Sequence, residues 1–138
     1  MVITSHGGMI KEKETFDDKC DGVVKLYDGK PLLTDLYTSG RKTENENVAD
    51  ISAMRCVIDI MNTIENADYK SFFNSFASSF AGGATRKYLE YLISEDEHAN
   101  YGVRVNTVLS NFQEFYDTYG ISENDAMYVK PENRITIW

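Results

Sequence analysis

The sequence predicts a mainly α-helical fold of about five helices, with an irregular connector and a short extended C-terminal tail. Apolar residues recur at three- and four-residue spacing in several segments, and capping residues or glycines stand where those segments begin or end. The 138 residues, 42% of them hydrophobic, are enough to bury one core. No repeat, low-complexity tract or charge run divides the chain, so we expect a single domain over residues 1–138.

The first helix is predicted over residues 11–27. Its apolar positions follow the helical period, and the glycine of "YDGK" ends it; they are Phe16, Cys20, Val23, Val24 and Tyr27. The next stretch, "PLLTDLYTSGRKTEN", mixes Pro, Gly, Ser and Asn with few apolar residues. This composition predicts a connector with a short extended piece.

A second helix should begin near Glu44. It carries a wide apolar stripe made of Val48, Ile51, Met54, Val57, Ile58, Ile60, Met61 and Ile64. Such a width indicates a central helix that is buried on much of its circumference. Cys20 and Cys56 both fall on apolar helix faces, so we expect buried free thiols, which favour a reducing compartment.

Three further helices are predicted in the second half of the chain. Asn66 or Asp68 caps one that carries a tyrosine and four phenylalanines and stops at a double glycine. Thr85 caps a short one, and "SNFQEFYDTYG" forms the last, which ends at Gly120. The tail "AMYVKPENRITIW" is apolar, interrupted by proline and too short for a helix.

The charge distribution excludes some classes of partner. The formal net charge is -8 and no run of Lys and Arg occurs, so nucleic acid is not expected as a partner. The start "MVITSHGGMIKEKE" lacks the apolar stretch of a signal peptide, and no apolar run approaches the ~20 residues of a membrane span. These features slightly favour a cytoplasmic location.

Two stretches carry the residue types of a catalytic site. In "NENVAD", Glu46 and Asp50 lie four residues apart at a helix start, where like charges repel each other. The simpler explanation is that the helix dipole favours negative charge at the N-terminus of a helix. The more specific one is that Glu46 binds a metal ion and Asp50 supports another metal ligand. In "SEDEHANYGVRVN", Asp96, His98 and Arg104 include a carboxylate that can orient an imidazole and two donors for an oxyanion.

Taken together, these stretches resemble the C-terminal part of the neprilysin and endopeptidase O family of zinc metallopeptidases. The family has a Gly-Glu-Asn-Ile-Ala-Asp stretch, matched by "NENVAD", and an Asp-x-His followed six residues on by Arg. It also has Leu-x-Asn-x-x-x-Phe, matched from Leu109 to Phe115, and an ending similar to "MYVKPENRITIW". The likeness runs from about residue 16 to residue 138.

The resemblance implies a role for each candidate residue. Glu46 would be a zinc ligand, and Asp50 would hold a metal-binding histidine. His98 would stabilise the oxyanion, Asp96 would orient His98, and Arg104 would bind a carbonyl of the peptide substrate. Zinc is the implied cofactor.

The sequence also departs from the family. It contains no His-Glu-x-x-His motif, and its two histidines, His6 and His98, are too far apart to form one. We therefore expect the isolated chain to be inactive and to bind zinc poorly or not at all, unless an N-terminal portion complements it. Asn45, Ser52 and Ala53 replace family glycines, and Phe80 replaces a Trp. The alternative function is that of a non-catalytic helical remnant that binds a peptide or a protein. In either case, the absence of the zinc-motif helix would leave an apolar face uncovered, and such a face would favour a homo-oligomer.

Overall fold

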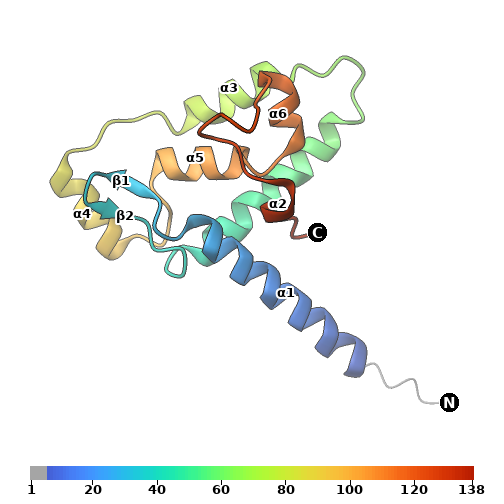
Figure 1. Cartoon of the computed structure of the whole chain (residues 1–138), viewed down its shortest axis with the longest axis horizontal. Coiled ribbons are helices and arrows are strands. Elements are labelled where there is room, and N and C mark those ends of the chain that lie inside the picture. Colours follow the sequence, from blue (N-terminus) through green and yellow to red (C-terminus); the bar gives the residue numbers. More distant parts are fainter. Residues whose placement is uncertain (1–5) are drawn as a thin grey trace.

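The computed structural model describes the backbone of residues 6–138 and the side chains of residues 12–138. The signal-peptide prediction rests partly on residues 1–5, which lie outside this range. The described residues form six α-helices, one small sheet and a 3₁₀ turn (Figure 1). In chain order the elements are α1 His6–Tyr27, β1 Pro31–Leu33, β2 Leu36–Tyr37, α2 Glu44–Met61, α3 Tyr69–Ser79, α4 Arg86–Glu95, α5 Tyr101–Leu109, α6 Gln113–Tyr119 and the turn Pro131–Asn133.

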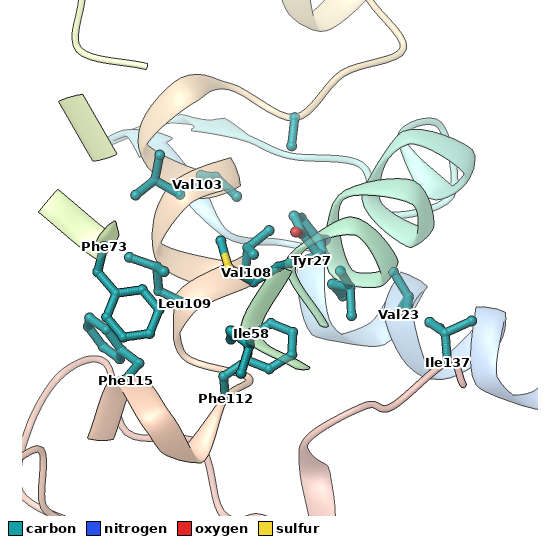
Figure 2. Packing of buried hydrophobic residues seen from close by; sticks show 14 of the residues in the cluster. Val23, Tyr27, Ile58, Phe73, Val103, Val108, Leu109, Phe112, Phe115 and Ile137 are labelled. Carbon is teal, nitrogen blue, oxygen red and sulfur yellow. The ribbon is translucent and has the colours of Figure 1, made fainter. Parts of the chain in front are cut away.

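One apolar cluster joins most of these helices. α2 packs against α1 and α5, and α3 packs against α6. The buried face of α2 consists of Asn47, Ile51, Met54 and Ile58, at the helical spacing that puts them on one side. Figure 2 shows residues from α1, α2, α3, α5 and α6 converging, together with Ile137 from the C-terminal tail. Figure 1 shows the N-terminal part of α1 projecting away from this body.

The expected caps and stops are confirmed at four helix ends. Asp68 accepts a hydrogen bond from the backbone N–H of Ser71, and Thr85 accepts one from the backbone N–H of Tyr88. α1 is followed by Gly29 and α6 by Gly120, whose φ values of 70° and 66° lie in the left-handed region that favours glycine. Local side-chain chemistry therefore sets these boundaries.

Helix α5 is an element that the sequence analysis missed. It contains Gly102 and the β-branched residues Val103, Val105, Thr107 and Val108, which have low helix propensity. Five of its nine residues are buried, so packing against α1, α2 and α3 stabilises a helix that propensity alone does not favour. The helix predicted over residues 110–120 is correspondingly shorter and begins at Gln113.

The expectation that α2 is buried on much of its circumference is wrong. Val57 and Ile60 have exposed fractions of 40% and 62%, because no described element covers this side, and Ile64, 55% exposed, lies beyond the end of the helix at Met61. Cys20 is buried, but Cys56 is exposed; both thiols are free. Cys56 is two residues from both Met54 and Ile58, a rotation of about 200° around the helix axis, so it faces away from the core.

The connector positions the start of α2 against α1. It contains the expected extended piece, an antiparallel pairing of β1 with β2. Gly40 then lies against the end of α1, where a Cβ atom would be 2.1 Å from the carbonyl oxygen of Val24. Its N–H donates to the Asp28 carboxylate at 3.0 Å. This close approach requires glycine, and it fixes where the carboxylates of α2 begin.

The C-terminal tail is held through hydrogen bonds to its backbone. The Asn111 side chain accepts from the N–H of Ile135 at 2.6 Å and donates to its carbonyl. The Tyr116 hydroxyl donates to the carbonyl of Ser110 at 2.7 Å and accepts from the N–H of Val129, also at 2.7 Å. Among the described helices, none combines the length and apolar character needed to cross a bilayer.

Candidate functional site

The structure brings all five predicted site residues together. Glu46 lies in the first turn of α2 and Asp50 one turn later on the same side of this helix. Asp96 ends α4, His98 lies in the short loop that follows, and Arg104 lies on α5. Residues that are 58 positions apart, from 104 minus 46, thus share one site because α5 packs against α2.

His98 lies between two carboxylates. Its Nδ1 is 2.7 Å from Oδ1 of Asp96, and its Nε2 is 3.2 Å from Oε2 of Glu46. The backbone N–H of His98 also donates to Oδ1 of Asp96 at 2.9 Å. The backbone and then the side-chain hydrogen bond from His98 lower the pKa of Asp96 below its ordinary value. Asp96 therefore stays ionised and fixes both the loop and the ring.

Arg104 forms a bidentate pair with Asp50. Nη2 donates to Oδ1 of Asp50 at 2.8 Å, Nε donates to Oδ2, and both side chains are only 18% exposed. The guanidinium Cζ also lies 4.9 Å from the centre of the Phe80 ring. Hydrogen bonding to Asp50 is the main cause that raises the pKa of Arg104. The guanidinium is thus held on two sides, while its other nitrogen makes no hydrogen bond to a described residue.

Tyr27 lies buried beneath this pair. Its side chain is at the centre of the apolar cluster (Figure 2), and its hydroxyl has no hydrogen-bond partner among the described residues. Burial is the main cause that raises the pKa of its phenol, and the Asp50 charge raises it further. Sequence analysis assigned Tyr27 only to an apolar helix face, since nothing in the local pattern indicates its proximity to the ion pair.

The donor set of this chain does not by itself fit a zinc centre. Zinc sites in proteins use at least three protein ligands. Over the part of the chain that the structure describes, no group of three or more His, Cys, Asp and Glu side chains is arranged to hold a metal ion. Glu46 is half-buried and His98 is exposed, so both remain accessible to groups from outside the chain.

The arrangement offers hydrogen-bond donors beside a carboxylate. The imidazole of His98 and the free guanidinium nitrogen of Arg104 can both donate to an oxygen atom, which is the chemistry that stabilises an oxyanion or binds a carbonyl. A cavity of about 20 Å³, lined in part by Lys42, Asp96 and His98, has room for one water molecule. The site therefore provides polar groups for binding an acyl compound.

Comparisons with known proteins agree on one family. The family model described as peptidase family M13 matches residues 6–135. A neutral endopeptidase from Lactococcus lactis subsp. cremoris is 31% identical over 128 residues, which cover 93% of this chain and 20% of the relative. Neprilysin-1 from Caenorhabditis elegans is 25% identical over an alignment 139 residues long, gaps included, that covers 89% of this chain and 18% of the relative.

A solved structure gives the same result. The crystal structure of PEPO from Lactobacillus rhamnosis HN001 (DR20) matches with a TM-score of 0.83 and 28% sequence identity, covering 91% of this chain and 20% of the other. The chain therefore spans about a fifth of the length of the relatives that it matches.

Proposed function

The chain belongs to peptidase family M13, a family of zinc-dependent peptidases, and we propose that it acts as the C-terminal portion of a neprilysin-like endopeptidase. The reaction is hydrolysis of peptide bonds in a peptide substrate. The grouping of Glu46, Asp50, Asp96, His98 and Arg104 in one site is the observation that carries this proposal. His98 and Arg104 are hydrogen-bond donors suited to a peptide carbonyl. The other three residues are carboxylates that hold a metal ion or a neighbouring side chain.

Each residue has a distinct role in the proposal. Glu46 supplies one zinc ligand, and Asp50 accepts a hydrogen bond from a metal-binding histidine supplied by another portion of the enzyme. The zinc, when bound, supplies Lewis-acid chemistry. His98 donates to the oxygen of the scissile carbonyl as negative charge develops on it, while Asp96 holds the ring. Arg104, fixed by Asp50 and Phe80, donates to a backbone carbonyl of the substrate.

The missing ligands have to come from outside this chain. The sequence has no His-Glu-x-x-His motif, so neither two further zinc ligands nor a general base for water is present. We propose that an N-terminal portion carrying that motif docks on the face of α2 that bears Glu46. Ala53, Val57 and Ile60 continue this face toward the C-terminal end of α2, and Val57 and Ile60 are exposed.

A complementation assay tests the proposal. The chain is mixed with a separately produced N-terminal portion of an M13 peptidase that includes the His-Glu-x-x-His motif, and cleavage of a fluorogenic peptide is measured with zinc and with a chelator. We expect zinc-dependent cleavage from the mixture and none from either part. Glu46→Gln should abolish it, and Glu14→Gln on the exposed part of α1 should not.

The second candidate function is binding without catalysis. It is favoured by the absence of the zinc motif from the sequence. In that case the mixture forms a complex without cleavage, and Glu46→Gln leaves the affinity of the complex unchanged. The two functions are therefore separated by cleavage and by the effect of this one substitution.

A further inference from the structure

A groove adjoins the small cavity of the candidate site. It has a volume of about 460 Å³ and lies between β1, α5 and residues 126–129. Leu32 and Asn100 line both this groove and the small cavity that His98 lines. The groove is therefore continuous with the surroundings of His98, although none of the five site residues lines it.

Among the described residues, Lys30 is the one charged residue that lines this groove. Its side chain is half-buried, and no hydrogen bond or ion pair joins its ammonium group to a residue in the described part of the chain. Burial lowers the pKa of this ammonium, and no nearby carboxylate counteracts the effect. The chain has a net charge of -8, yet none of its described carboxylates pairs with this half-buried ammonium group. An anion from outside the chain can therefore serve as its partner.

Helix α5 presents further unpaired polar groups to the same groove. The carboxamides of Asn100 and Asn106 make no side-chain hydrogen bond to another described residue. Thr107 is 1% exposed, and its hydroxyl has no partner in the described structure. The unpaired hydroxyl of Thr107 is buried and therefore costs free energy, whereas Asn100 is half-buried and Asn106 is exposed, so both carboxamides are accessible to a ligand or a bridging water.

Gly102 lies on the groove side of α5 where a larger residue would fit. A Cβ atom there would have no neighbour within 4 Å. Glycine has a lower helix propensity than alanine, so this position does not favour the helix by itself. The glycine thus leaves space beside Asn100 and Asn106 that a bound backbone can occupy.

We propose that this groove binds a carboxylate of a peptide, with Lys30 as the counter-ion and the amides of Asn100 and Asn106 bonding to the peptide backbone. The inference rests on the proposed peptidase function, since it makes the groove a subsite for the peptide that reaches His98. The carboxylate belongs either to an acidic side chain or to the C-terminus of the peptide.

Binding of matched peptides to the intact chain tests this proposal without zinc or a second portion. The probes are acetyl-Ala-Phe-Ala and its C-terminal amide, and acetyl-Ala-Phe-Asp amide with its Asn counterpart. The signal of the lysine ε-carbon is followed by NMR. We expect one carboxylate peptide to bind at least about tenfold more tightly than its neutral partner and to raise the pKa of Lys30. The pair that shows the difference identifies the source of the carboxylate.

Three variants complete the experiment. Lys30→Met should remove the preference for the carboxylate, Lys30→Arg should keep it, and Lys87→Met, at an exposed lysine of α4, should have no effect. Equal affinity within both pairs, absence of binding at millimolar concentration, or a preference that survives in Lys30→Met would overturn the proposal. Since no cleavage is measured, these outcomes are independent of the complementation assay.

Discussion

At the scale of single residues, the Asp50–Arg104 pair is the least exposed ion pair of the candidate site. The exposed pair between Asp35 and Arg86 is also bidentate, through Nη1 and Nη2 of the arginine, and its side chains are 60% and 54% exposed. Exposed pairs contribute little because water screens them, whereas removing one partner of an enclosed pair leaves an unpaired charge. The two pairs therefore compare an enclosed with an exposed Asp–Arg pair, the exposed arginine having a second carboxylate partner in Glu90.

We predict that Asp50→Ala lowers the free energy of unfolding by about 2 to 3 kcal/mol, because Arg104 then remains enclosed without its carboxylate. Urea denaturation at pH 7 measures the loss. The double variant Asp50→Ala with Arg104→Ala should lose less than the sum of the two single variants. Asp35→Ala should cause a much smaller loss, and similar losses for Asp35→Ala and Asp50→Ala would contradict this account.

At the scale of elements, α3 depends on the carboxylate that caps it. Oδ1 of Asp68 accepts from the N–H of Ser71 at 2.9 Å, and Oδ2 accepts from its hydroxyl at 2.7 Å. These hydrogen bonds lower the pKa of Asp68 from its ordinary value of 3.8. Because the folded-state pKa is lower than the unfolded one, the contribution to stability is present above about pH 4 and is lost as the pH falls through the folded-state pKa.

The variant Asp68→Asn keeps an effective capping residue but does not titrate. We predict that the wild-type chain melts at a higher temperature than this variant at pH 7. The gap should narrow as the pH falls below about 4, because protonation of Asp68 removes the charged acceptor. Thermal unfolding followed by circular dichroism between pH 2 and pH 7 measures the gap. A gap that stays constant over this range would rule out the charged cap as its cause.

At the scale of the whole molecule, the exposed side of α2 is an apolar surface that no described element covers. Val57 and Ile60 lie there, on the part of α2 that follows Glu46 and Asp50. Neighbouring exposed apolar side chains favour association. In the absence of a complementing portion, we expect this surface to join copies of the chain.

Replacing Val57 and Ile60 by Gln should therefore reduce self-association while leaving the folded monomer stable, because neither residue contributes to the buried cluster. Sedimentation velocity over a range of concentrations measures the association. The control is Leu33→Gln with Tyr37→Gln, which removes similarly exposed apolar residues from the β1–β2 hairpin. A wild-type chain that stays monomeric at high concentration would contradict the expectation of a homo-oligomer.

The sequence by itself determined the helical class, most of the helices and the residues of the candidate site. Helical periodicity and caps such as Asp68 and Thr85 act within one turn, so their effect can be seen in a short window. The pattern also identified Glu46, Asp50, Asp96, His98 and Arg104, which the structure brings together.

Only the tertiary structure decided what depends on contacts between distant segments. Packing stabilises α5 against its own weak helix propensity. Cys56 and Ile60 are exposed because no described element packs against their side of α2. Apolar periodicity cannot reveal how many elements surround a helix. The pairing of Arg104 with Asp50 and the isolation of Lys30 follow from the approach of α5 to α2 and to β1. Burial and charge pairing are properties of this arrangement in space, because they depend on which side chains meet across the core.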